Sequence, residues 1–486
     1  MDKLKTIVFL VLVGIFIYLR LGPILNQTVP YTYDQGRDFL KAQEMIKDKH
    51  LTFIGPTTGI QGVFHGAWWY YFLAPLYLIF NGWPQGYYLG LFFINLIVNL
   101  WFFRFLKRDY GFLTAIFFLG LVSVSEFFIN TSFYASNNTL APLFVLTLIF
   151  ALYQYFDKKN PYYAFMIGLS LGFILETELA FGLFLIPAFV IVYLLFKKLK
   201  DFPYFLIGLI VPSIPRLLFE AKNNFLQTRS LITQLTSAKE THPLQFSAAV
   251  VERTRSFWQY WTGIFYHQEL FISVAFLVFL VIAIFFIKKS STTKKTLFAF
   301  LAILLVIVYA FSILYKNNFF WSYYLDGIQY IFLFLLVSGF HFLEKNKKTT
   351  WLPVGCLIIV IGINLFVFFK NATNKNKVPL LGLRADNQII NYLVDASKHQ
   401  YFCLNIYTPP VIPYTYMYLL SYYADQGKII YPKEDFVNNQ CYFLIDQDEY
   451  QFRVDQWREK NIPAEAEKEK TIKFQNGSVI ELWTKK

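Results

Sequence analysis

Asp34 and Arg37 occur in the stretch 31–39, which reads Tyr-Thr-Tyr-Asp-Gln-Gly-Arg-Asp-Phe and follows the first apolar segment. A carboxylate in such a place can take the proton from a hydroxyl group, and a guanidinium group can stabilise a departing phosphate. The alternative for Asp34 is a helix cap, because an Asp before a helical run accepts backbone N–H groups of the first turn. The alternatives for Arg37 are an i,i+3 ion pair with Asp34 and a contact with a lipid headgroup.

Further charged residues lie near the ends of apolar segments. Charged side chains near membrane depth are costly, so those that occur there face a cavity or a partner. Glu176 and Glu178 could hold a divalent cation, orient an acceptor, or mark the water boundary at a helix end. Arg216 and Arg229 are candidate phosphate ligands. Glu126 falls inside an apolar segment, where burial without a partner would be unfavourable.

His65 and Trp258 are the remaining candidates from side-chain chemistry. His65 could contact a phosphate or a sugar, although a single His among aromatic residues more often belongs to a packed interfacial turn. Trp258, with Tyr260 and Trp261 beside it, could stack on a sugar or an acceptor, and the alternative is an interfacial aromatic belt. Three cysteines without Cys/His spacing argue against a zinc site.

The amino-acid composition indicates the class of protein to which these residues belong. The 486 residues are 56% hydrophobic, 21% aromatic and 15% charged, which is too apolar for an ordinary soluble domain. The formal net charge of +13 could indicate a nucleic-acid partner. The Lys and Arg residues, however, cluster between apolar segments, as the positive-inside rule describes. We therefore expect a protein of the plasma membrane that contacts membrane lipids and no nucleic acid.

Apolar segments near a bilayer thickness recur along the chain and predict about eleven transmembrane helices. Basic clusters mark alternate ends and lie on the side of the N-terminus, which is therefore expected in the cytoplasm. On this topology a transmembrane domain, 1–370, has a first outer loop, 23–85, and a large outer loop, 220–268. The segments are 6–21, 87–103, 112–129, 139–156, 162–179, 180–196, 203–219, 270–287, 296–314, 323–343 and 351–369.

The first outer loop contains two further pieces. In 34–49, apolar residues form one helical face against charged residues, a pattern typical of a helix that lies along a membrane surface. The stretch 64–80 is aromatic and carries Pro75, which suits the headgroup region. Two amphipathic membrane-surface helices are therefore expected, with Asp34 at the start of the first.

The composition changes after a polar linker, 371–377, and the remainder, 378–486, reads as a small extracytoplasmic α/β domain. A helix is expected at 387–397 and strands at 401–407 and 441–445, and Asn476-Gly477 predicts a hairpin. Cys403 and Cys441 lie in two candidate strands. Their spacing leaves two alternatives open, a disulfide and two buried thiols.

Several stretches together resemble bacterial members of the glycosyltransferase C superfamily, the polyprenyl-phosphate-sugar enzymes related to protein O-mannosyltransferases and aminoarabinose transferases. The resemblance covers about the first half of the chain. It rests on 33–38 (Tyr-Asp-Gln-Gly-Arg-Asp), 51–56 (Leu-Thr-Phe-Ile-Gly-Pro), 62–75, 134–142 (Tyr-Ala-Ser-Asn-Asn-Thr-Leu-Ala-Pro) and 214–220 (Ile-Pro-Arg-Leu-Leu-Phe-Glu).

The resemblance implies an all-α polytopic membrane domain whose first outer loop carries an essential Asp, which maps onto Asp34. It also implies an outer-face reaction that inverts the anomeric centre by direct displacement, and it places Asn137 in a second outer loop that contacts acceptor or sugar. Two departures matter. Gln35 stands where many relatives have Glu, and Asn137 and Asn138 stand where many have an acid. Both favour the metal-independent branch, so no metal ligand is assigned and no cofactor is required, with a divalent cation as the alternative.

Three functions remain open from the sequence. The first is an inverting glycosyltransferase that moves a sugar from a polyprenyl-phosphate donor to a lipid, glycan or protein acceptor, with Asp34 as general base. The second is a transporter or flippase of lipid-linked sugars, which should show internal repeats and charges near the bilayer midplane. The third is a polytopic anchor for the C-terminal domain, in which Asp34 would be dispensable.

Overall fold

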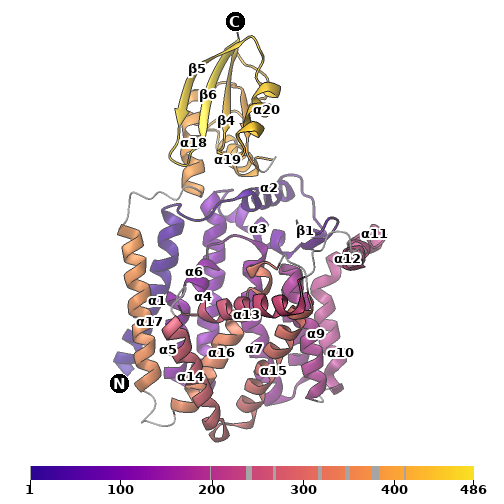
Figure 1. The fold of residues 1–486 in the computed structure, drawn as a ribbon, viewed down its shortest axis with the longest axis vertical. Helices are drawn as coiled ribbons and strands as arrows, with labels where there is room; N and C mark the ends of the chain where they lie inside the picture. Colours follow the sequence, from indigo (N-terminus) through magenta and orange to yellow (C-terminus); the bar gives the residue numbers. More distant parts are fainter. Residues whose placement is uncertain are drawn as a thin grey trace. The chain divides into compact units, whose positions relative to one another are not determined.

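A computed structural model describes residues 2–196, 199–236, 244–265, 270–315, 320–344, 351–373, 382–409 and 412–485. Most of this chain is helical, and the strands form one small hairpin and one four-stranded sheet (Figure 1). The chain divides into two compact units. Unit 1 comprises Met1–Leu21, Leu51–Tyr71 and Leu91–Asn371, and unit 2 comprises Gly22–His50, Phe72–Gly90 and Ala372–Lys486.

Many of the helices coincide with apolar segments of the sequence. The helices are α1 (Asp2–Leu25), α2 (Tyr33–Lys47), α3 (Trp68–Ile79), α4 (Pro84–Asp109), α5 (Phe112–Val124), α6 (Glu126–Asn130), α7 (Ala141–Lys158), α8 (Pro161–Thr177), α9 (Leu179–Leu195), α10 (Phe202–Ile210), α11 (Ile214–Lys222), α12 (Leu226–Thr236), α13 (Phe246–Thr262), α14 (Leu270–Phe286), α15 (Thr292–Leu314), α16 (Ile328–Glu344), α17 (Trp351–Thr373), α18 (Leu383–Ser397), α19 (Tyr414–Asp425) and α20 (Gln451–Asn461). Of these, α2, α12 and α20 are amphipathic or polar.

Five helical stretches among the described residues are long and apolar enough to cross a membrane, and five shorter apolar helices accompany them. This confirms the class, a multi-pass helical membrane protein, while the count of about eleven spans and the sidedness of the termini stay predictions. The long stretches are Lys3–Leu25, Pro84–Asp109, Asn137–Lys158, Phe202–Lys222 and Thr292–Leu314.

Several expected segments are interrupted, among them 323–343, where α16 begins only at Ile328. The segment 112–129 breaks at Ser125, where α5 ends and α6 begins, and Glu126 is exposed in the first turn of α6. The expectation of one continuous span over 112–129 was therefore wrong, and Glu126 is not buried inside the protein. The segment 203–219 is broken by a short 3-10 turn, Val211–Ser213, that contains Pro212. Proline lacks the N–H group that a continuous helix needs.

Arg20, near the C-terminal end of α1, is fully buried in unit 1 and joins α1 to the break between α5 and α6. Its Nε donates to Ser132 Oγ at 2.9 Å, and Nη1 donates to the Ser123 carbonyl at 3.0 Å. Its Nη2 donates to the carbonyls of Val122 at 2.7 Å and Phe128 at 3.0 Å. One guanidinium group thus satisfies carbonyl groups that the end of a helix leaves without intrahelical partners.

The C-terminal part of unit 2 holds a four-stranded sheet in the order β3-β4-β6-β5, accompanied by α18, α19 and α20. Helix α18 precedes β3, α19 joins β3 to β4, and α20 joins β4 to β5. Strands β3 and β4 run parallel, and β6 pairs antiparallel with both β4 and β5. The expected small α/β fold is confirmed here, although the domain limits 1–370, 371–377 and 378–486 stay predictions. The strands are β1 (Ile54–Thr57), β2 (Phe64–Gly66), β3 (Leu404–Tyr407), β4 (Gln440–Ile445), β5 (Ala466–Lys473) and β6 (Val479–Lys485).

Cys403 and Cys441 form a disulfide, so the first of the two alternatives for these cysteines holds. Cys403 directly precedes β3 and Cys441 lies in β4, the strand that pairs with it. Both are buried in a cluster with Phe443. The expected hairpin at Asn476-Gly477 is also present, with Gly477 at a φ of +88°.

Candidate active site

The helix that carries Asp34 begins with a capping box in unit 2. Thr32 is the N-cap residue, and the Gln35 side-chain oxygen accepts hydrogen bonds from the Thr32 backbone N–H at 2.8 Å and from its hydroxyl at 2.6 Å. The Gln35 side chain thus satisfies two donors of the N-cap residue. Asp34 therefore lies in the first turn of α2 and is not its N-cap residue. The alternative that Asp34 caps the helix was wrong.

Asp34 lies on the exposed side of this turn, with 57% of its side chain accessible. Its Oδ1 is 3.0 Å from Arg37 Nη1, and Arg37 Nε is 2.9 Å from Oδ1 of the buried Asp38. Arg37 thus bridges two carboxylates. The i,i+3 ion pair considered from the sequence is present, and binding of a phosphate by Arg37 stays a prediction. The arrangement leaves the Asp34 carboxylate open to a reacting hydroxyl group.

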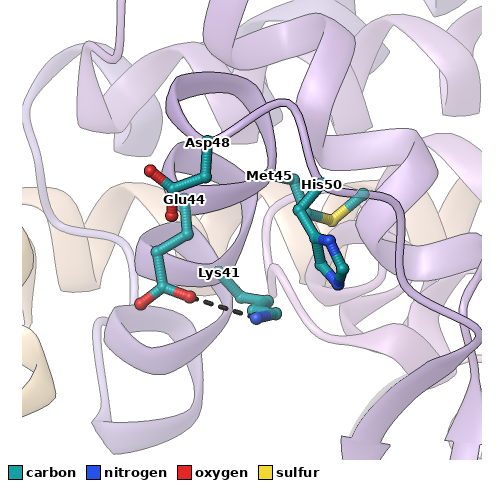
Figure 2. Close-up of a pocket in the computed structure, with 5 residues that line it drawn as sticks. All are labelled: Lys41, Glu44, Met45, Asp48 and His50. Carbon is teal, nitrogen blue, oxygen red and sulfur yellow. Dashed lines mark hydrogen bonds and ion pairs between the residues drawn. The ribbon is translucent and has the colours of Figure 1, made fainter.

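Two hollows in unit 2 lie along α2 beyond Asp34. The first, of about 230 Å³, is lined by Lys41, Glu44, Met45, Asp48 and His50, with Lys41 and Glu44 paired at 3.1 Å (Figure 2). The second, of about 250 Å³, is lined by Leu40, Gln43, Glu44, Lys47, Asp48, Met417, Ser421 and Tyr431. At about 1.5 Å of helix rise per residue, Asp48 is roughly 20 Å from Asp34. Neither hollow marks the position of the candidate base.

A second group of candidates meets in unit 1 around Glu176, at the C-terminal end of α8. Glu176 is almost fully buried, and its Oε1 accepts from Arg216 Nε at 3.0 Å and from Ser213 Oγ at 2.8 Å. Arg216 Nη1 also donates to the Phe64 carbonyl at 2.8 Å and to Gln227 Oε1 at 3.0 Å. Arg216 therefore connects α8, α11, α12 and the β1–β2 hairpin.

Gly66 allows this hairpin to approach Glu176. A Cβ atom at position 66 would lie 2.1 Å from Glu176 Oε2, so a side chain cannot be accommodated without displacing the carboxylate. The neighbouring His65 is thereby brought to the same part of unit 1. Within the described chain, the buried Nη2 of Arg216 has no hydrogen-bond partner. The two N–H donors of Nη2 thus remain for an anion such as a phosphate oxygen.

Three other residues, Glu220, Arg229 and Trp258, lie on α11, α12 and α13, respectively. The Glu220 carboxylate accepts from the backbone N–H groups of Gln227 and Thr228, both at 2.9 Å, and so holds the start of α12. Arg229 is exposed on α12, and Trp258 is half-buried on α13. The hydrogen bonds around Glu176 include neither of these two residues.

Asp326, which the sequence analysis missed, lies near Glu178 in unit 1. Asp326 Oδ2 is 3.4 Å from Asn138 Nδ2, and its Oδ1 is 3.3 Å from Gln329 Nε2. Glu178 caps α9 by accepting from the Ala180 N–H at 3.3 Å. In the sequence, Asp326 could be noticed only as the acidic residue of an Asp-Gly pair directly before an apolar segment. The residues that surround Asp326 in the structure, such as Asn138, come from distant parts of the chain.

Glu178 and Asp326 both lie in connections, outside the apolar helices Leu179–Leu195 and Ile328–Leu343. Burial raises the pKa of each carboxyl group above its ordinary value, and the nearby Asp326 charge raises the pKa of Glu178 further. Asn137 takes a structural position beside them, donating from Nδ2 to the Thr177 carbonyl at 2.6 Å. Two buried carboxyl groups that interact in this way can donate as well as accept hydrogen bonds.

The sequence matches no protein-family model and no curated protein sequence. Several solved structures match this chain, among them two that match along nearly its whole length. One is ArnT from Cupriavidus metallidurans bound to undecaprenyl phosphate, at 9% identity and a TM-score of 0.62, covering 99% of this chain and 98% of that one. The other is the same protein in the apo state, at 10% identity and a TM-score of 0.63, covering 99% and 97%. The chain therefore has the fold of this aminoarabinose transferase, the GT-C fold, which confirms at the level of fold the resemblance seen in the sequence.

Proposed function

We propose that the protein is an inverting glycosyltransferase that uses a polyprenyl-phosphate sugar at the outer face of the membrane. The observation that carries this proposal is the end-to-end structural match to ArnT, one of whose structures binds undecaprenyl phosphate. The position of Asp34 in the first turn of an amphipathic helix, exposed beside Arg37, supports it.

In the proposed reaction, the Asp34 carboxylate accepts the proton of an acceptor hydroxyl or amine as that group attacks the anomeric carbon. The new bond to the anomeric carbon forms as the bond between this carbon and the phosphate oxygen breaks. The leaving polyprenyl phosphate keeps the bonding electron pair, and the configuration inverts. Arg37 orients the base through its 3.0 Å ion pair.

Within unit 1, we assign Arg216 to an anion such as the lipid phosphate. Its Nε and Nη1 are held by Glu176, Phe64 and Gln227, which fixes the plane of the guanidinium group, and Nη2 remains for the ligand. Arg216→Lys should weaken binding of the polyprenyl-phosphate donor. A single ammonium group cannot contact Glu176, Phe64 and Gln227 and also present free N–H donors to the phosphate. A titration with polyprenyl phosphate measures the effect, and unchanged affinity in the folded variant contradicts the assignment.

The outer-face location is supported by the Cys403–Cys441 disulfide, because structural disulfides persist in oxidising compartments. Labelling of an introduced cysteine in the C-terminal domain of intact cells by a membrane-impermeant reagent tests it. Labelling only after the membrane is opened would place the domain in the cytoplasm and contradict the proposal.

The central experiment compares wild type with Asp34→Asn, using a panel of polyprenyl-phosphate sugars and a cell-envelope extract. Loss of a general base should lower transfer about 10²- to 10⁴-fold. Asp48→Asn is the matched control, since Asp48 is an exposed carboxylate at the other end of the same helix. Equal transfer by folded Asp34→Asn and wild type removes Asp34 from the mechanism, and no transfer by wild type overturns the proposed function.

A further inference from the structure

Helices α2 and α19 pack against each other within unit 2, although about 370 residues separate them in the sequence (Figure 1). Helix α19 belongs to the C-terminal α/β part of the unit, between β3 and β4. Helix α2 begins one residue before Asp34. The C-terminal part of the chain therefore contacts the element that carries the candidate base.

The contact is closest at the first turn of α2. A Cβ atom on Gly36 would lie 2.5 Å from the Thr415 nitrogen and 2.5 Å from the Tyr414 carbonyl carbon, which are backbone atoms. No change of side-chain conformation can relieve such an overlap. The Tyr31 hydroxyl donates to the Thr415 carbonyl at 3.0 Å. The start of α19 is thus fixed against α2 two residues from Asp34.

The middle of the contact is aromatic. Phe39 is fully buried, with its ring stacked on Tyr87 at a centroid distance of 4.0 Å and edge-on to Tyr418 at 5.4 Å. The Tyr418 hydroxyl is itself hydrogen-bonded to the Gly82 carbonyl at 2.6 Å. Burial of such rings in defined pairs gives a rigid contact with little freedom for α2 to slide.

The far end of the contact is polar. Gln43 Nε2 donates to Asp425 Oδ2 at 2.7 Å, and Ser421 Oγ donates to Gln43 Oε1 at 3.0 Å. Lys47 Nζ is 2.7 Å from Asp425 Oδ1. Since Gly36, Phe39 and Gln43 lie one turn apart, α19 holds a whole face of α2.

From this geometry we infer that α19 positions Asp34, so that the C-terminal domain is part of the catalytic apparatus through its contact with α2. This inference rests on the proposed function. The Asp34 side chain is exposed, and the ion pair described for it is with Arg37 of the same helix. The location of the carboxylate therefore follows that of α2. A displacement of about 1 Å between base and reacting atom can lower a rate about 10²-fold.

The test exchanges the polar pair at the far end of the contact, which lies outside the proposed reaction. Gln43→Glu places two carboxylates together and should loosen α19 from α2, lowering kcat about tenfold while the KM of the donor stays within about twofold. Adding Asp425→Asn should restore kcat. The amide introduced at position 425 would donate to the carboxylate introduced at position 43, Ser421 can still donate, and Lys47 lies one helical turn from that carboxylate. Gly36→Ala should lower kcat without rescue.

The outcomes separate the two hypotheses. The positioning role is overturned if folded Gln43→Glu has an unchanged kcat. If wild type transfers the sugar and Asp34→Asn does not, the proposed function still holds in that case. A raised acceptor KM at unchanged kcat also overturns it, because the domain would then bind the acceptor. No transfer by wild type overturns the proposed function and, with it, the inference. Melting temperature and a monodisperse elution profile establish folding for each variant.

Discussion

Replacing Glu176 by glutamine distinguishes a structural from a catalytic role for this buried carboxylate. The Glu176 side chain is 1% exposed and that of Arg216 is 14% exposed, so the ion pair is largely shielded from water. Glutamine keeps an acceptor for Ser213 but removes the carboxylate that pairs directly with Arg216, and Glu220 remains as a nearby negative charge. Breaking one side of a buried pair costs about 3–5 kcal/mol. Since Arg216 is partly accessible, we expect the free energy of unfolding to fall by about 3 kcal/mol, the lower end of that range.

The assay is unfolding in mixed micelles with a rising fraction of denaturing detergent, followed by intrinsic tryptophan fluorescence. The matched control is Glu252→Gln, because Glu252 pairs with Arg255 at 3.3 Å on the surface, where the side chains are 46% and 65% exposed. Exposed pairs contribute about 0–1 kcal/mol, so this control should unfold close to wild type. If Glu176→Gln also unfolds like wild type yet loses transfer, the carboxylate acts on a ligand and the structural reasoning is refuted.

Four further predictions follow from other contacts. Cys403→Ser should destabilise the C-terminal domain by about 4 kcal/mol, the loop-entropy value for a separation of 38 residues, measured by hydrogen exchange of β4 amides. Arg20→Met should lower the yield of folded protein in detergent, because the guanidinium group that donates to four carbonyl groups and one hydroxyl group is lost. The same substitution at the exposed Arg229 should not lower the yield. Burial raises the pKa of Asp386 and Asp446, so the folded domain binds more protons than the unfolded chain. The stability of the domain should therefore fall as pH rises above about 4. Asp386→Asn should make this dependence weaker, and hydrogen exchange at several pH values measures it. Transfer should be insensitive to a chelator, and loss of activity that added divalent cation restores would contradict this.

The pH prediction depends on the surroundings of the two aspartates. Asp446 accepts from the Tyr416 hydroxyl and the Ser478 hydroxyl, each at 2.7 Å, and both donors are neutral. Ionised Asp446 therefore faces neutral donors, ionised Asp386 faces the Asp446 carboxylate, and desolvation is the largest effect on both. A stability that rises with pH from about 4 to 7 would show that an opposite charge compensates this burial, contrary to our reasoning.

Parts of this fold were predictable from local pattern. The amphipathic period of 34–49 predicted α2, and the Asn476-Gly477 pair predicted the β5–β6 hairpin, because each signal lies within one element. The interactions of Arg20 could not be predicted, since Ser132 lies 112 residues away. Asp326 was missed for the same reason, as Asn138 comes from a loop 188 residues earlier. The Cys403–Cys441 disulfide stayed one of two alternatives because it depends on the parallel pairing of β3 and β4.

The start of α2 explains how adjacent residues acquire different roles. Successive residues of a helix are about 100° apart, so when Gln35 turns back to close the capping box on Thr32, Asp34 must point elsewhere. Gln35 is fully buried and Asp34 is mostly exposed. A glutamate at position 35 would keep the same hydrogen bonds but would have to be buried as a charge or hold a proton, and burying an unpaired charge is costly. The neutral amide avoids this buried charge, while its Nε2 is buried without a hydrogen-bond partner among the described residues. The glutamine at position 35 therefore has a local role at the helix start, and it does not by itself remove any group from Asp34.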